Sequence, residues 1–411
     1  MMNRRQLLGS VAAASTLGSV SSAFAFGTPQ TFSIKDFTRD VEEIVRIDSP
    51  SGCAEGVRKV ADVFTRRFES IGWTVTRHEI GKWGPGLVAT NTPDQSAYDV
   101  ILCGHMDTVQ PVGHAAKYPF TVKGERAYGA GVADDKSSLT VLWYTVRDLP
   151  KDVLKNLRIC VLLSPAEEVG PDDVNEFLIE YGRRGKYALV YEPGRPDGSF
   201  TKGRKSCTWI KVDFKGVSAH AGNNPQDGRN AIDAMALAIP QINSVVKDLP
   251  GVTINTGMVK GGTAVNTVAD TAEVTFDLRT VRNEDTETVM NRVKALTEKG
   301  FAKDVKATMS IVSRGYAMEY NAMSDRLRKT VDAACSEAGF RNYDWLSVGG
   351  ASDGNTLSRA GLGVVDSMGA VSGNLHNVEK EYVELTSVST RIAIGKRTLA
   401  IMAANRKKYF E

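Results

Sequence analysis

The chain has 411 residues, of which 42% are hydrophobic and 24% are charged. This composition is typical of a globular protein and excludes a disordered or low-complexity chain. The 51 basic and 48 acidic residues nearly cancel, so the charge indicates neither a nucleic-acid partner nor a membrane partner. The length predicts two domains, and a small molecule or a peptide is the expected ligand.

Residues 1–25 differ from the rest of the chain. Arg4 and Arg5 precede an apolar run of small residues at 11–20, and Ala23-Phe24-Ala25 has the A-x-A form of a cleavage site. We predict a twin-arginine signal peptide, with a Sec signal as the alternative. The mature protein is therefore expected to be periplasmic or secreted.

Short apolar runs alternate with helical spacing after the signal. Strands are expected at 74–79, 100–103, 157–163 and 187–191, and helices at 37–71 and 138–148. Such alternation is typical of a mostly parallel sheet covered by helices on both faces. We predict an α/β domain whose first part spans 26–206.

The pattern changes near Cys207. Strands are expected at 208–214, 252–259, 272–279 and 306–313, and helices at 229–246 and 285–299. This βαββαβ order resembles a ferredoxin-like domain, which we place at 207–314 as an insertion. The sheet domain resumes over 315–411, with a helix expected at 325–338 and a strand at 362–366.

Acidic residues follow several predicted strands. His105 and Asp107 come directly after one strand, and Asp107 is placed to orient the His105 imidazole. Further acidic motifs follow at Asp134-Asp135, Glu167-Glu168 and Glu192. The carboxyl ends of parallel strands meet at one edge of a sheet, where adjacent carboxylates repel unless cations neutralise them. A divalent metal explains the whole series, whereas solvated loop charges explain only a single motif.

With a late histidine, His376, these motifs resemble the two-zinc metallopeptidase family of glutamate carboxypeptidase, aminoacylase and succinyl-diaminopimelate desuccinylase. The sequences of the motifs most resemble those of bacterial glutamate carboxypeptidase. The resemblance implies two Zn²⁺ ions per chain, with Co²⁺ and Mn²⁺ as alternatives, and a cis peptide bond between Asp134 and Asp135. By this resemblance, one ion is held by His105, Asp134 and Glu192, the other by Asp134, Glu168 and His376, and Glu167 is the general base. Two such ions can together activate a water and polarise a carbonyl.

The resemblance extends into the inserted domain. Ser218-Ala219-His220-Ala221-Gly222 matches the family's S-x-H-A-G motif, whose histidine stabilises the oxyanion; a surface histidine is the alternative. Asn266 and Arg279 match substrate-binding positions, and Arg279 is the candidate for the substrate carboxylate. Gly350 is also a candidate substrate-binding residue, because it lies in a sequence that resembles the family's glycine-rich loop, which approaches the substrate backbone. Ala166 and Ser137-Ser138 depart from the family pattern without removing a ligand or the base.

The resemblance implies a hydrolase that cleaves an amide or peptide bond beside a C-terminal carboxylate and releases glutamate or a similar amino acid. An N-acyl amino acid deacylase or a dipeptidase of the same family is the alternative. A catalytically silent periplasmic protein that binds a metal or a ligand is an alternative of another class. The resemblance also implies a homodimer through the inserted domain, in which His220 serves the neighbouring active site.

Overall fold

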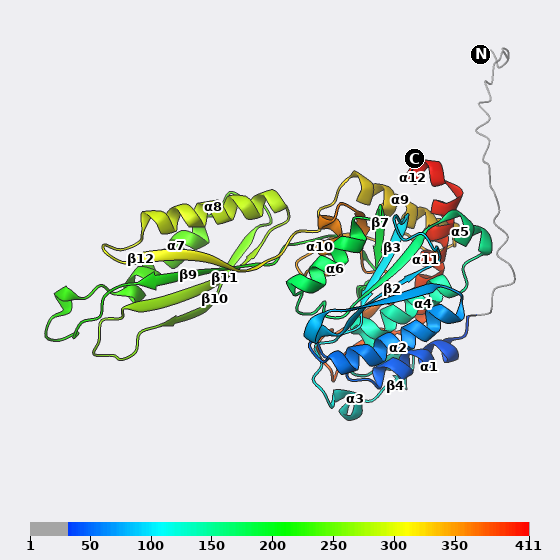
Figure 1. Cartoon of the computed structure of the whole chain (residues 1–411), viewed down its shortest axis with the longest axis horizontal. Coiled ribbons are helices and arrows are strands. Elements are labelled where there is room, and N and C mark those ends of the chain that lie inside the picture. Colours follow the sequence, from blue (N-terminus) through cyan, green and yellow to red (C-terminus); the bar gives the residue numbers. More distant parts are fainter. Residues whose placement is uncertain (1–31, 411) are drawn as a thin grey trace, which may run out of the picture.

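The structure is a computed structural model that describes residues 32–410, so the predicted signal at 1–25 lies outside the described residues. An α/β body and an elongated domain that projects from it are joined by two chain segments (Figure 1). The chain leaves the body after β8 (Phe200–Arg204) and returns after β12 (Lys306–Arg314). Within residues 32–410, no helix is both long enough and apolar enough to cross a membrane.

The body is built on a six-stranded sheet with the order β1-β2-β6-β3-β7-β14. Its strands are β1 (Thr74–Glu79), β2 (Pro85–Thr90), β3 (Val100–His105), β6 (Ile159–Ser164), β7 (Tyr187–Val190) and β14 (Gly363–Val365). The β1–β2 and β2–β6 pairs are antiparallel, whereas β6, β3, β7 and β14 pair in parallel. The predicted α/β fold with a mostly parallel sheet is confirmed.

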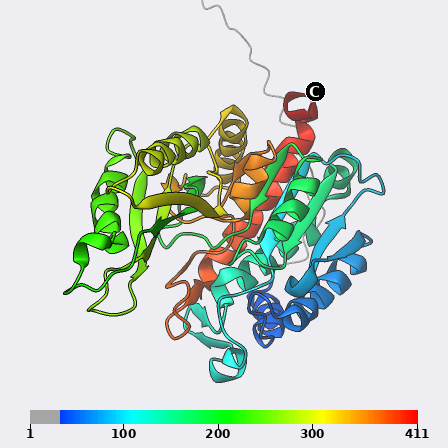
Figure 2. The same ribbon diagram turned by 60° about the vertical axis from the view of Figure 1, so that its left-hand side comes forward.

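Helices cover both faces of this sheet, as Figure 2 shows from a second side. One face packs against α1 (Ile34–Val45), α2 (Ala54–Ser70), α4 (Ser138–Arg147), α9 (Ala322–Glu337) and α11 (Leu385–Ala404). The other face packs against α6 (Asp172–Gly182) and α10 (Asp353–Arg359). On β3, Val100 and Leu102 belong to the first core, and Ile101 and Cys103 to the second. Alternate side chains thus enter opposite cores, which is why the strand is apolar throughout.

Smaller elements complete the body. They are α3 (His114–Lys117), α5 (Lys151–Asn156), α12 (Arg406–Phe410), β4 (Thr121–Lys123), β5 (Arg126–Tyr128), β13 (Trp345–Val348), β15 (Ser372–Gly373) and β16 (Tyr382–Glu384). β13 pairs with β8, and β15, β16, β5 and β4 form a separate sheet. This sheet joins the loop after β5 to the loop between β15 and β16, and both loops contribute to the candidate site.

The inserted domain, which we define as 208–314, has an antiparallel sheet with the order β10-β11-β9-β12. Its elements are β9 (Thr208–Lys215), α7 (Ala231–Ser244), β10 (Thr253–Gly261), β11 (Thr271–Arg279), α8 (Asn283–Lys299) and β12. On β9, Ile210, Val212 and Phe214 are buried in a core shared with α7 and α8. The βαββαβ order is that predicted for a ferredoxin-like insertion.

Candidate active site

The predicted metal ligands lie together at one edge of the main sheet. His105 ends β3, the Glu167-Glu168 pair follows β6, and Glu192 follows β7. Because β6, β3 and β7 are parallel neighbours, these side chains emerge at the same edge. Asp134 comes from the kinked segment Val132–Ser137, and His376 comes from the loop between β15 and β16.

The Asp134 carboxylate lies between the two histidines. Its Oδ1 is 3.0 Å from Nε2 of His105, and its Oδ2 is 3.3 Å from Nε2 of His376. Glu192 Oε1 lies 3.8 Å from the His105 nitrogen, and Glu168 Oε2 lies 3.5 Å from the His376 nitrogen. The contacts form two groups that share Asp134, each with one histidine and one glutamate. The Asp134–Asp135 peptide bond is cis.

The donor atoms fit a pair of metal ions. Ligand atoms of His105, Asp134 and Glu168 lie within 4.8 Å of one another, as do those of His105, Glu167 and Glu192. Oε1 of Glu168 and Oε1 of Glu192 are buried and accept no hydrogen bond from the described residues. Buried carboxylates are costly without a cation, and imidazole with carboxylate suits zinc.

The three glutamates of the cluster hold protons more strongly than ordinary carboxyl groups, whereas the two histidines outweigh burial and lower the pKa of Asp134. Burial, followed by the charge of Glu192, raises the pKa of Glu167 well above its ordinary value. Burial and the charge of Asp134 raise the pKa of Glu168 to about 7. Burial opposes the charge of His105, but Asp107 and Asp134 outweigh it and raise the pKa of His105. A cation that binds here would therefore displace protons.

Asp107 is completely buried and organises the neighbouring groups. Its Oδ1 lies 3.2 Å from Nδ1 of His105, and its Oδ2 accepts the Ser51 hydroxyl at 2.6 Å. Its oxygens also accept the backbone N–H groups of Glu167 at 3.0 Å and Glu168 at 3.2 Å. Asp107 thus orients both the His105 imidazole and the loop of the two glutamates.

Comparison with known proteins shows which families this chain resembles. The chain matches the family model of a peptidase dimerisation domain over residues 202–305. It is 29% identical over 384 residues to carboxypeptidase G2 of Pseudomonas sp. (strain RS-16), covering 90% of this chain and 89% of that protein. The chain is therefore similar to M20 peptidases in its dimerisation domain and to carboxypeptidase G2 over most of its length.

Two further proteins are similar to this chain. A succinyl-diaminopimelate desuccinylase of Acidovorax ebreus (strain TPSY) is 25% identical over 366 residues, covering 82% of this chain and 91% of that protein. The crystal structure of the M20 family metallo-carboxypeptidase Sso-CP2 from Sulfolobus solfataricus superposes with a TM-score of 0.66 at 15% identity, covering 90% of this chain and 99% of that chain. At this identity, the superposition shows a shared fold.

His220 and Asn266 lie apart from the metal ligands of their own chain. β9 begins beside the body and runs away from it along the inserted domain (Figure 1). Its 8 residues span roughly 27 Å at about 3.4 Å per residue, and His220 follows them. His220 is exposed, and the Asn266 carbonyl accepts the backbone N–H of the next residue, Ala221. One chain by itself therefore does not bring these two residues to the cluster.

Arg279 and Gly350 lie where the inserted domain meets the body. The Arg279 guanidinium is paired with Asp277 at 3.0 Å, and its Nη1 is 3.5 Å from the Gly349 carbonyl oxygen. A Cβ atom at Gly350 would meet only Arg204 Nη1, at 4.0 Å. Arg279 is thus close to the glycine-rich loop, although Asp277 already neutralises part of its charge.

Arg204 is a site residue that no sequence motif marks. It forms a bidentate pair with Asp366 at 2.7 and 2.9 Å, and its Nη2 lies 3.8 Å from Glu192 Oε2. Its Nη1 donates to the carbonyl oxygen of Gly350 at 3.3 Å. Arg204 therefore connects the glycine-rich loop to the ligand Glu192, through contacts between residues that are distant in the sequence.

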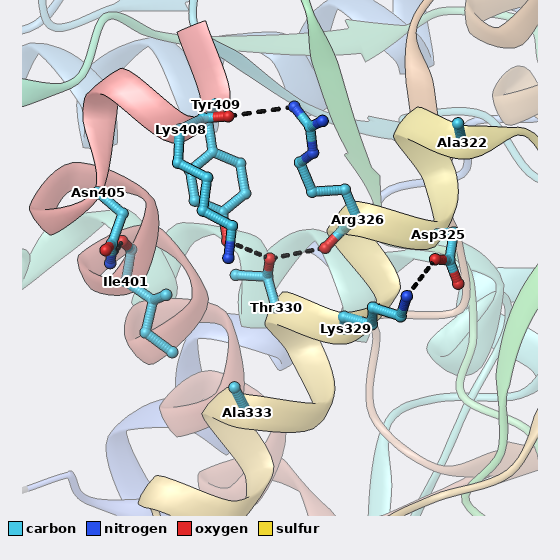
Figure 3. A pocket seen from close by; sticks show the side chains of 10 residues that line it. All are labelled: Ala322, Asp325, Arg326, Lys329, Thr330, Ala333, Ile401, Asn405, Lys408 and Tyr409. Atoms are coloured by element: carbon cyan, nitrogen blue, oxygen red, sulfur yellow. Dashed lines mark hydrogen bonds and ion pairs between the residues drawn. The ribbon is translucent and has the colours of Figure 1, made fainter. Parts of the chain in front are cut away.

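A groove of about 480 Å³ lies between α9 and the C-terminal helices (Figure 3). Its polar lining includes Arg326, Lys329, Thr330 and Lys408, and its acidic residue Asp325 pairs with Lys329 at 2.7 Å. The groove contains none of the residues of the metal cluster. We assign it no role in the reaction.

Proposed function

We propose that this chain is an M20 peptidase and a glutamate carboxypeptidase-like hydrolase, which cleaves an amide bond beside a C-terminal carboxylate and releases glutamate or a similar amino acid. The main observation behind this proposal is that Asp134 lies between His105 and His376, and that each histidine also has a glutamate beside it. Similarity to carboxypeptidase G2 supports the type of bond. The presence of Arg279 supports a substrate with a free carboxylate, since a guanidinium can bind a carboxylate through two hydrogen bonds.

The residues take distinct roles in this proposal. His105, Asp134 and Glu192 would hold one zinc ion, and Asp134, Glu168 and His376 would hold the other. Two zinc ions supply Lewis-acid chemistry, which polarises a carbonyl and makes water a better nucleophile at neutral pH. Glu167 takes a proton from the attacking water and gives it to the leaving amine. His220 stabilises the negative charge that develops on the carbonyl oxygen.

We further propose that His220 acts in the active site of a second copy. The match to a peptidase dimerisation domain supports a homodimer. β10 and β12 are the edge strands of the inserted sheet, and an edge strand can pair with another chain. The separation of His220 from the ligands of its own chain favours this arrangement over a site completed within one chain.

A second candidate is an N-acyl amino acid deacylase, which the similarity to a succinyl-diaminopimelate desuccinylase favours. The test compares kcat/KM of the zinc-loaded protein for N-acyl glutamates, N-succinyl amino acids and dipeptides. We expect the highest value for N-acyl glutamates. A higher value for N-succinyl amino acids or dipeptides would replace the glutamate proposal, and no turnover by protein that holds two ions would indicate a silent binding protein.

A further inference from the structure

Glu381 has a buried carboxylate that binds the backbone beside the bridging aspartate. Its side chain is buried, with 1% of the residue exposed. Its Oε1 accepts the N–H of Ala133 at 2.8 Å and the N–H of Asp134 at 3.2 Å. One carboxylate oxygen therefore satisfies two successive backbone donors at the start of the segment that carries Asp134.

These donors need an acceptor outside their own segment. The first N–H groups of a helical segment have no partner within it, and Val132–Ser137 is kinked at Asp134, with φ −111° and ψ 92°. Without Glu381, both N–H groups would be buried and unpaired, and the Asp134 peptide would be free to turn. The side-chain carboxylate of Asp134 moves with that peptide.

Glu381 also belongs to the loop of the second histidine. It follows His376 in the chain and directly precedes β16, which pairs with β5. Its own backbone N–H bonds to the Asn377 carbonyl at 2.7 Å. Glu381 thus fastens the His376 loop to the Asp134 segment, so that one side chain fixes the relative position of two ligands.

We propose that Glu381 is a positioning residue of the metal centre, which holds the Asp134 carboxylate where both histidines can share an ion with it. The inference rests on the proposed function, because a shared Asp134 matters only if two ions bind. It extends that function, because Glu381 is not one of the ligands. Partners that orient a ligand typically contribute 10- to 100-fold to metal affinity.

The two ions should not respond equally to the loss of Glu381. The His105 side chain is 1% exposed and is held by Asp107, whereas the His376 side chain is 56% exposed. Glu381 adds the hydrogen bonds that connect the His376 loop to the backbone of the Asp134 segment. Loss of that connection should therefore weaken the ion held by His376 and Glu168 more than the ion held by His105 and Glu192.

The test uses the mature protein with the substitutions Glu381→Ala, Glu381→Gln and Glu381→Asp. Glu384→Ala is the matched control, since Glu384 is a glutamate of β16 that bonds to the exposed Arg126 at 2.8 Å. Zinc affinity of each site is measured by competition with a chromophoric chelator. Thermal unfolding of the metal-free proteins shows whether each variant folds.

We expect Glu381→Ala to bind one ion with an affinity within about 3-fold of the unsubstituted protein and the other about 10- to 100-fold more weakly. Glu381→Gln should stay within about 3-fold at both sites, because its amide oxygen can accept the same N–H groups. Glu384→Ala should match the unsubstituted protein. If Glu381→Ala does not fold, Glu381→Asp carries the test, since its shorter side chain should weaken the second ion by at least about 10-fold.

Unchanged affinity at both sites in Glu381→Ala, or in Glu381→Asp where that variant carries the test, would overturn the positioning role. Equal weakening in Glu381→Gln and Glu381→Ala would overturn it as well, because the charge and not the accepted hydrogen bonds would then matter. The proposed function fails separately, if the unsubstituted protein binds fewer than two ions.

Discussion

Asp107 fixes the backbone of Glu167, because its Oδ1 accepts the Glu167 N–H at 3.0 Å. The contact holds the main chain of the proposed base in place and leaves its side chain available to the reaction. It also makes the role of the Glu167 side chain testable without loss of the surrounding loop.

Glu167→Gln should lower kcat by roughly 10²- to 10⁴-fold, because the amide cannot accept the proton of the attacking water. Two zinc ions should remain bound, since the ligands and the Asp107 contact are unchanged. The measurements are steady-state kinetics and elemental analysis of the dialysed protein. The potential ligand atoms of Glu167, His105 and Glu192 also lie within 4.8 Å of one another. A Glu167→Gln variant that loses an ion would therefore show that Glu167 is a metal ligand.

Arg279→Ala should raise KM for substrates with a free terminal carboxylate and should leave KM nearly unchanged for the corresponding amides. A lost charge-assisted hydrogen bond costs about 1.5 to 3 kcal/mol, which corresponds to roughly 10- to 150-fold in KM. Arg282→Ala is the control, because Arg282 is a nearby arginine that pairs with Glu284. Equal losses on acids and amides would make Arg279 a structural residue, fixed by its pair with Asp277.

A mixture of inactive Glu167→Gln and inactive His220→Ala proteins should regain activity after subunit exchange. In a mixed dimer, one site has both defects and the other has neither, so an equal mixture should reach about one quarter of full activity. Exchange is checked by mass spectrometry of differently tagged chains. Proven exchange without recovered activity would show that His220 serves its own chain.

Replacement of Arg4 and Arg5 by lysine should abolish export, because the twin-arginine route recognises the arginine pair. The measurement is the ratio of periplasmic to cytoplasmic protein after cell fractionation. A Sec-exported reporter protein in the same cells is the control. Unchanged periplasmic yield would replace the twin-arginine proposal with a Sec signal.

Local periodicity was enough to predict most of the main elements. The predicted strands at 74–79 and 187–191 correspond to β1 and β7, because apolar alternation and short apolar runs reflect burial on one or both faces. β2 was not predicted, since Pro85 and Gly86 begin it and both residues weaken a strand pattern. The single helical region expected at 37–71 is divided into α1 and α2, which a loop through Asp48 separates.

The sequence by itself determined which acidic residues follow strand ends, since that order depends only on neighbours along the chain. Only the tertiary structure placed Arg204 against Asp366, Glu381 against the N–H of Asp134, and His220 against Thr267. Glu381 and Asp134 are separated by 247 positions, and no local pattern encodes such a contact. Their proximity results from the pairing of β5 with β16, which becomes defined only when the whole body packs around its two cores.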